Sequence, residues 1–251
     1  INNTLDKCRL DLSIFKMGLV SSRQKAISII LAGNVFVNNK KIVKAGFIVK
    51  VGSIVKIKRK EHEWVSRGGI KLATAFEKFN FDIRDKICID LGSSTGGFSD
   101  VLLQNGASEV FCVDVGYGQL DWKIRNNPRI KVLEKTNARY LDNALINKKI
   151  DLLVCDVSFI SIKKIIPNCL NFLNNFFDLI ILIKPQFEAE RKFISKGGII
   201  RDEKIHKMVC EDIKNWFSRE MNLRVINIIE SSIKGQKGNK EFFIHVKDKN
   251  L

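Results

Sequence analysis

Proline and histidine are scarce in this chain of 251 residues, and long apolar runs are absent. Only 3 prolines and no biased tract, with 45% hydrophobic and 28% charged residues, exclude a fibrous or disordered chain and indicate a globular protein. The longest apolar runs, such as Leu179 to Ile183, are far shorter than the about 20 residues that span a bilayer. We therefore expect no membrane helix and, since charged residues interrupt the N-terminal segment, no secretory signal.

The 6 cysteines form no C-x-x-C pair, and none lies at zinc-ligand spacing from the 3 histidines. We therefore expect no metal site. Cys88, Cys112 and Cys155 each lie in an apolar run and are expected to be small buried side chains. Reduced thiols are typical of the cytoplasm, which is the compartment that the sequence favours.

Acidic residues are also few, since 27 Asp and Glu stand against 43 Lys and Arg, for a formal net charge of +16. Such a surplus favours a polyanionic partner, because lysines gain affinity by displacing counterions from phosphates. Residues 1–66 hold 13 Lys and Arg against 4 Asp and Glu, so the surplus is concentrated there. Lys, Asn and Ile are abundant throughout, so an AT-rich genome is an alternative source of the bias.

A charged stretch, KRKEHE at residues 58–63, separates two segments of different character. We place a first domain at residues 1–60, a linker at 61–66 and a second domain at 67–251.

The first segment predicts a small α+β domain. Its pattern favours a short helix from Leu10 to Gly18 and a second helix that Ser21 and Ser22 cap and Gly33 ends. Short strands are expected from Val35 to Ile57, with a turn at Asn38-Asn39.

In the second segment, four apolar runs each end at a charged residue. The runs alternate with helical stretches, as in βαβ units, so each is expected to be a parallel strand. Parallel strands point the same way, and doubly wound α/β folds bind ligands at the carboxyl edge of the sheet. The charged residues are Asp90, Asp114, Asp156 and Lys184. The pattern therefore predicts a doubly wound, Rossmann-like α/β domain with an active site at that edge.

A glycine-rich loop, DLGSSTGGFS, follows the first of these strands from Asp90 to Ser99. Its glycines permit a tight turn and a close approach of the backbone to a ligand. Asp114 follows the next strand, where a carboxylate can bind both ribose hydroxyls of an adenosine-containing cofactor. Because Ser94 occupies a glycine position of G-x-G-x-x-G, the loop does not favour a dinucleotide. Glycines that serve only a tight turn are the alternative.

The segments RLD, SSRQKAISIILAGNVFVNN and VGSIVKI closely resemble the S4-type RNA-binding domain, over nearly all of the first segment. The resemblance implies that its helices present basic residues to structured RNA. A merely solvated charged face is the alternative for each residue alone. The implied RNA-binding residues are Arg9, Arg23, Lys25, Lys40 and Lys41, with Arg67 of the following SRGG segment.

The segments SRGGIKL, DLGSSTGGFSD, VDVGYGQLDWK, TNAR, DVSFIS, IKPQFE and IKGQKGNKEF resemble, in order, the TlyA (hemolysin A) family of FtsJ-like ribose methyltransferases. The resemblance implies a class I methyltransferase sheet and S-adenosylmethionine as the cofactor. The cofactor-binding residues that it implies are Asp90, Gly92, Ser93, Ser94, Thr95, Gly96, Gly97, Phe98, Asp114, Asn137 and Asp156.

The same resemblance implies a catalytic tetrad of Lys71, Asp156, Lys184 and Glu241. A ribose hydroxyl is a poor nucleophile, so the enzyme must orient it and help to remove its proton. In the family pattern Lys184 is the central lysine, Asp156 and Glu241 orient it, and Lys71 assists at the hydroxyl. Alone, a strand-end aspartate is often a turn cap and a lysine usually faces solvent.

The resemblance implies 2′-O-methylation of cytidine in large-subunit ribosomal RNA, and in some members also in small-subunit RNA. Ribosomal RNA or ribosomal subunits are thus the expected partners, with no obligatory protein partner. Two alternatives are a non-catalytic RNA-binding assembly factor and a membrane-active hemolysin. No amphipathic or spanning segment supports the latter.

Overall fold

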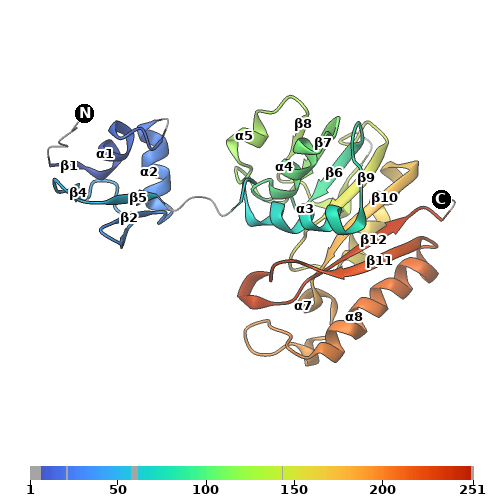
Figure 1. Cartoon of the computed structure of the whole chain (residues 1–251). Helices are drawn as coiled ribbons and strands as arrows, with labels where there is room; N and C mark the ends of the chain where they lie inside the picture. Colours follow the sequence, from blue (N-terminus) through green and yellow to red (C-terminus); the bar gives the residue numbers. More distant parts are fainter. Residues whose placement is uncertain (1–6, 21, 58–61, 143, 250–251) are drawn as a thin grey trace. The chain divides into compact units, whose positions relative to one another are not determined.

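The structure is a computed structural model that describes residues 7–20, 22–57, 62–142 and 144–249. The chain divides into two compact units, Ile1–Glu63 and Trp64–Leu251 (Figure 1). The charged residues 58–61, where the sequence suggests a boundary, and Ser21 of the expected helix cap lie outside the described residues. Trp64 packs in the core of the second unit, so residues 64–66 of the expected linker belong to that unit.

The first unit is a small α+β domain, as the sequence predicts. Helix α1 (Leu10–Lys16) packs against α2 (Arg23–Leu31), whose N-terminus is capped where the Ser22 hydroxyl accepts from the Lys25 amide at 3.1 Å. Asn38 and Asn39 adopt positive φ in the β2–β3 hairpin, as a tight two-residue turn requires. The strands are β1 (Cys8–Arg9), β2 (Val35–Val37), β3 (Lys40–Ile42), β4 (Ile48–Val49) and β5 (Val55–Ile57).

The second unit is built on a seven-stranded sheet with the order β11-β12-β10-β9-β6-β7-β8. Neighbouring strands from β10 to β8 are parallel, whereas β12 is antiparallel to both β10 and β11. The strand order reverses between β6 and β9, which makes their carboxyl ends the switch point where such folds bind ligands. The strands are β6 (Ile87–Leu91), β7 (Glu109–Val113), β8 (Ile130–Leu133), β9 (Ile150–Cys155), β10 (Leu173–Ile183), β11 (Arg224–Glu230) and β12 (Phe242–Lys247).

Helices cover both faces of this sheet (Figure 1). Successive strand residues face opposite sides, so Leu152 and Val154 of β9 join one core while Leu153 and Cys155 join the other. The first face carries α3 (Arg67–Phe79), α4 (Gly97–Gln104) and α5 (Trp122–Arg125), and the second carries α6 (Ile166–Cys169) and α8 (Glu203–Asn215). None of the described helices is long and apolar enough to cross a membrane.

Three of the four charged residues expected at the carboxyl edge lie there. Asp114, Asp156 and Lys184 each follow the last residue of a strand. Asp90 does not, because β6 continues through Leu91 and the alternation of the strand turns the Asp90 side chain into the core. There its Oδ2 accepts a hydrogen bond from the Ser99 hydroxyl of α4 at 2.6 Å.

Candidate active site

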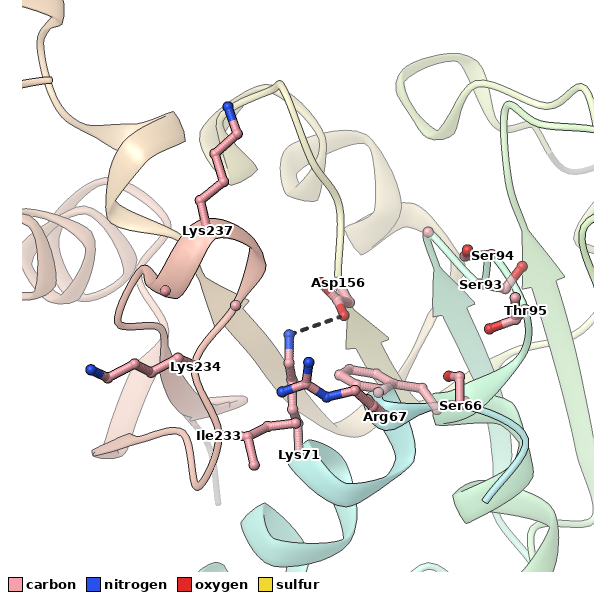
Figure 2. A pocket seen from close by; sticks show the side chains of 16 residues that line it. Ser66, Arg67, Lys71, Ser93, Ser94, Thr95, Asp156, Ile233, Lys234 and Lys237 are labelled. Carbon is pink, nitrogen blue, oxygen red and sulfur yellow. Dashed lines mark ion pairs between the residues drawn. The ribbon is translucent and has the colours of Figure 1, made fainter. Parts of the chain in front are cut away.

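Four charged side chains meet at the carboxyl edge and form one alternating chain of ion pairs. Lys71 Nζ, from α3, lies 2.6 Å from Glu241 Oε2 and 3.9 Å from Asp156 Oδ2. Lys184 Nζ lies 2.5 Å from Asp156 Oδ1. Figure 2 shows Lys71 rising from its helix toward Asp156 at the end of β9. The fold thus brings together all four residues of the expected tetrad, from positions up to 170 residues apart.

The members of this tetrad are largely withdrawn from solvent, with 9% of Lys71, 8% of Lys184 and 3% of Glu241 exposed. Buried charges are tolerated when they are paired, and here two carboxylates balance two ammonium groups. Lys184 donates a further hydrogen bond to the Ser158 hydroxyl at 2.8 Å. Since Pro185 begins α7 (Pro185–Glu188) directly after Lys184, the backbone cannot continue as a strand there.

Glu241 is held just before β12, where its backbone carbonyl accepts from the Ser231 amide at 2.9 Å. Its carboxylate lies against Gly235, at a place that a Cβ on residue 235 would occupy. A glycine is therefore needed in this loop for the Glu241 carboxylate to reach Lys71.

A cavity of about 570 Å³ opens in front of the tetrad and is lined by Lys71 and Asp156. Its other walls are the start of α3, the glycine-rich loop and the loop between β11 and β12. In Figure 2 Arg67 lies beside Lys71, whereas the Lys234 and Lys237 side chains point away from Asp156. The volume of this cavity lies in the range of small-molecule binding sites.

A second cavity of about 400 Å³ is lined by Asp114, Asn137 and Phe159. The two cavities share Gly92, Ser94 and Asp156 as lining residues, so they adjoin at the tetrad. The Asp114 carboxylate accepts backbone hydrogen bonds from Ser94 at 2.8 Å and Gly116 at 2.7 Å. This fixes its orientation at the cavity wall.

Two glycines bring the backbone of the loop close to its neighbours. Gly92 adopts a positive φ of 81°, and a Cβ there would lie 2.8 Å from the Asp156 carbonyl oxygen. At Gly97 a Cβ would collide with the Ser66 hydroxyl and lie 2.9 Å from the Gly69 amide nitrogen. The glycines therefore serve close packing of the loop against the tetrad and α3, besides the turn itself.

Most of the residues expected to bind a cofactor line one of the two cavities. The exceptions are Asp90, which is buried behind the loop, and Gly96, which packs against Leu120 and Ile124. Those that line a cavity are Gly92, Ser93, Ser94, Thr95, Gly97, Phe98, Asp114, Asn137 and Asp156.

The expected RNA-binding residues of the first unit are all exposed. Arg9 and Arg23 both pair with the buried Asp11, at 3.1 and 2.9 Å. Burial opposes the charged form of Asp11, but hydrogen bonds from the two arginines outweigh it and lower the pKa of Asp11. Lys25, Lys40 and Lys41 are exposed as well, while Arg67 belongs to the second unit and lines the larger cavity.

Several residues that line the cavities were not among the expected site residues. Ser66 and the pair Lys234 and Lys237 line the larger cavity, and Ser158 and Phe159 line the smaller one. Ser158 and Phe159 lie within the DVSFIS segment, so their proximity to Asp156 was a usable signal. Across the described residues, no group of three or more His, Cys, Asp or Glu side chains is placed to hold a metal ion.

Comparisons with protein families match both units. The FtsJ-like methyltransferase family matches residues 64–248, and the S4 domain family matches residues 8–55.

Curated relatives and a solved structure align over almost the whole chain. Hemolysin A of Brachyspira hyodysenteriae is 42% identical, covering 94% of this chain and 98% of its own length. The 16S/23S rRNA (cytidine-2′-O)-methyltransferase TlyA of Mycobacterium tuberculosis is 36% identical over 95% of this chain and 89% of its own. A solved structure from Streptococcus thermophilus, described as a hemolysin, is 38% identical with a TM-score of 0.74, covering 97% of this chain and 89% of that one.

Proposed function

The chain belongs to the FtsJ-like methyltransferase family, in the group of the TlyA and hemolysin A proteins, and we propose that it transfers a methyl group from S-adenosylmethionine to a cytidine 2′-hydroxyl of ribosomal RNA. The observation that carries this proposal is the buried chain of ion pairs that joins Glu241, Lys71, Asp156 and Lys184 beside two adjoining cavities. The S4 domain supplies an RNA-binding unit. Because ribosomes are the substrate in this proposal, we also propose the cytoplasm as the compartment of the reaction.

The residues around the smaller cavity fit S-adenosylmethionine. The oriented Asp114 carboxylate suits ribose hydroxyls, and Asn137 and Phe159 offer an amide and an aromatic ring to an adenine. Because Gly92 has no Cβ, its backbone packs directly against the Asp156 backbone at the wall of this cavity. When bound, the cofactor supplies an electrophilic methyl group.

The larger cavity then receives the ribose. Lys184, held by Asp156 and Ser158, would orient the 2′-hydroxyl. Once Lys184 has released its own proton to solvent, its neutral amine would accept the hydroxyl proton as the oxygen attacks the methyl group. Lys71 is held by Glu241 and lies beside Asp156. Its positive charge would stabilise the negative charge that develops on the attacking oxygen.

Of the two alternatives, a non-catalytic assembly factor would have no need of three buried charges paired with one another and with the partly buried Asp156 beside a cavity. A membrane-active hemolysin is the other, and the name of a relative suggests it. The FtsJ-like family match and the assembled tetrad favour the methyltransferase over both.

The proposal is tested by incubating the purified chain with ribosomal RNA, subunits and whole ribosomes, using S-adenosylmethionine with an isotopically labelled methyl group. We expect label on the 2′-oxygen of specific cytidines, mapped by mass spectrometry of RNA fragments. Label on a base, or no transfer to any ribosomal substrate, would contradict the proposal.

The matched variants are Lys184→Ala and Lys184→Arg. Loss of general-base assistance commonly costs on the order of 100-fold to 10,000-fold in rate, so we expect such a loss in single-turnover transfer for the Ala variant. The Arg variant should recover little, because a guanidinium keeps the charge but cannot accept a proton near neutrality. Cofactor affinity, measured by calorimetry, should be retained in both. A fully active Arg variant would instead assign Lys184 a purely electrostatic role.

A further inference from the structure

The loop between β11 and β12 determines where the Glu241 carboxylate lies. Gly235 of this loop packs against that carboxylate, and its amide donates to the Asn239 carbonyl oxygen at 2.9 Å, which closes the loop on itself. Asn239 lies two residues before Glu241, and only 4% of it is exposed, although asparagine is mostly a surface residue. A buried amide side chain needs partners for both its oxygen and its nitrogen.

The Asn239 side chain has both partners in the segment between α7 and α8. Its Oδ1 accepts from the Ile200 amide at 3.1 Å, and its Nδ2 donates to the Gly198 carbonyl oxygen at 3.0 Å. The segment is anchored in turn to α8, because Nε2 of the buried His206 lies 3.2 Å from the Ile200 carbonyl oxygen. One side chain thus joins the loop that carries Glu241 to a segment fixed on a helix.

Asn239 itself is not among the described residues that line either cavity of the active site, so it is not placed to touch a cofactor or a ribose. Its link to the site is Glu241, whose Oε2 lies 2.6 Å from Lys71 Nζ. The neighbouring Lys240 reaches Glu203 of α8 at 3.2 Å, but that ion pair is exposed, and such pairs hold a backbone weakly. The buried amide of Asn239 is therefore the stronger anchor of the loop beside Glu241.

We propose that Asn239 is a positioning residue for methyl transfer, an inference that rests on the proposed function. By fastening the β11–β12 loop to the segment before α8, Asn239 keeps the Glu241 carboxylate at Lys71. Lys71 lies beside Asp156, which holds Lys184, so a shift of Glu241 passes along the chain of ion pairs to the lysine that orients the hydroxyl. A misplacement of about 1 Å at a reacting group can cost on the order of 100-fold in rate.

The first measurement is the ¹H–¹⁵N NMR signal of the Lys71 ammonium group in the full chain without ligands, assigned with Lys71→Arg. Ammonium protons exchange with water too fast to be seen unless a buried hydrogen bond holds the group. We expect the signal in the wild type and its loss in both Glu241→Gln and Asn239→Ala. The matched control is Asn168→Ala, because Asn168 also donates to a distant carbonyl oxygen, that of Leu141 at 3.0 Å. Asn168 belongs to α6, none of whose residues lines either cavity in the described part of the chain.

Three results of this measurement would overturn the proposal. They are a Lys71 signal that persists in Asn239→Ala, a signal that is lost equally in the control, and a signal that is absent from the wild type. If Asn239→Ala does not fold, Asn239→Asp replaces it, since a carboxylate still accepts from the Ile200 amide but cannot donate to the Gly198 carbonyl oxygen.

The second measurement is a double-mutant cycle in single-turnover methyl transfer at saturating cofactor and RNA. If Asn239 acts through Glu241, Asn239→Ala should slow transfer by about 10-fold to 100-fold in the wild type but by less than about twofold in Glu241→Gln. Asn168→Ala should change the rate by the same factor in both backgrounds. An equal loss for Asn239→Ala in both backgrounds would show that Asn239 only stabilises the fold. That result, or an unchanged rate in the wild-type background, would overturn the proposal.

The NMR signal requires no methyl transfer, so it decides the inference even where the chain or Glu241→Gln transfers nothing. A chain that transfers no methyl group to any ribosomal substrate, yet loses the Lys71 signal in Asn239→Ala, would contradict the proposed function and leave Asn239 as the residue that positions Glu241. Failure of the inference and failure of the proposed function are therefore distinguishable.

Discussion

At the scale of single residues, the buried charged side chains described in the second unit differ in their partners: the tetrad residues are ion-paired, whereas Asp90 has no cationic partner. Glu241 and Lys184 are both buried, and each lies within 2.6 Å of an opposite charge. Removing one partner of such a pair leaves an uncompensated buried charge, which commonly costs about 3 to 5 kcal/mol. Substitutions in the tetrad must therefore be checked for folding before a loss of activity is assigned to chemistry.

Asp90 is the contrasting case, because it is fully buried and its Oδ1 has no hydrogen-bond partner. Burial, together with the nearby charges of Asp156 and Asp114, raises the pKa of Asp90 to about 7, although the hydrogen bond from the Ser99 hydroxyl lowers it in part. The folded protein therefore holds a proton on Asp90 between about pH 4 and 7, where the unfolded chain has lost it. This contribution to stability is complete below about pH 4 and is lost as the pH rises through 7.

Asp90→Asn should remove that pH dependence, because the amide keeps the shape and an acceptor for Ser99 but does not titrate. We expect the wild type to lose stability relative to the variant between pH 5 and pH 8. Urea unfolding followed by tryptophan fluorescence measures this, since all 3 tryptophans (Trp64, Trp122 and Trp216) lie in the second unit. A difference between the two proteins that stays constant over this pH range would show that Asp90 is ionised throughout.

At the scale of elements, the site depends on how closely α3 and α4 approach each other. A Cβ at Gly97, the first residue of α4, would collide with the Ser66 hydroxyl and lie 2.9 Å from the backbone nitrogen of Gly69. A hydroxyl can rotate away, but the backbone of α3 cannot move without shifting Lys71. Helix contact and catalytic geometry are therefore coupled at this glycine.

Gly97→Ala is expected to destabilise the second unit by about 1 to 3 kcal/mol, the usual cost of overpacking. Alanine favours helices over glycine by up to about 1 kcal/mol, which offsets only part of this cost. The control is Gly68→Ala, whose Cβ would meet its nearest neighbour, the Ser66 hydroxyl, at an ordinary 3.4 Å. Chemical denaturation compares the two variants, and equal stability would mean that α3 and α4 can separate without cost.

The sequence predicts the elements of this site better than their contacts. Apolar runs that end at a charged residue identify Asp156 and Lys184 as strand-end residues, because burial on both faces makes parallel strands continuously apolar. The same pattern misplaces Asp90, since an apolar run does not show whether the strand stops before or after a polar residue. Ser158 beside Lys184, and Arg224 opposite Lys247, depend on loop closure and strand register, which only the folded chain specifies.

At the scale of the whole molecule, the two units divide charge unequally. The unit Ile1–Glu63 holds 13 Lys and Arg against 4 Asp and Glu, for a net charge of +9 in a quarter of the chain. The unit Trp64–Leu251 has a net charge of +7 and contains the tetrad with both adjoining cavities. Long-range attraction to RNA thus falls mainly to the first unit, and chemistry to the second.

A fragment of residues 64–251 should therefore bind S-adenosylmethionine like the full chain but bind ribosomal RNA more weakly, by on the order of tenfold or more at low salt. Its affinity should also depend less on salt, because fewer phosphate contacts release counterions. The fragment must begin at Trp64, since Trp64 is buried in the core and the Val65 amide donates to Asp100 at 2.8 Å. A fragment that starts at Arg67 lacks both contacts and would confuse misfolding with lost RNA affinity. Calorimetry measures the cofactor affinity of the fragment and of the full chain, and RNA titrations at several salt concentrations measure their RNA affinity and its salt dependence. Equal RNA affinity and salt dependence in the two proteins would place RNA recognition in the methyltransferase unit alone.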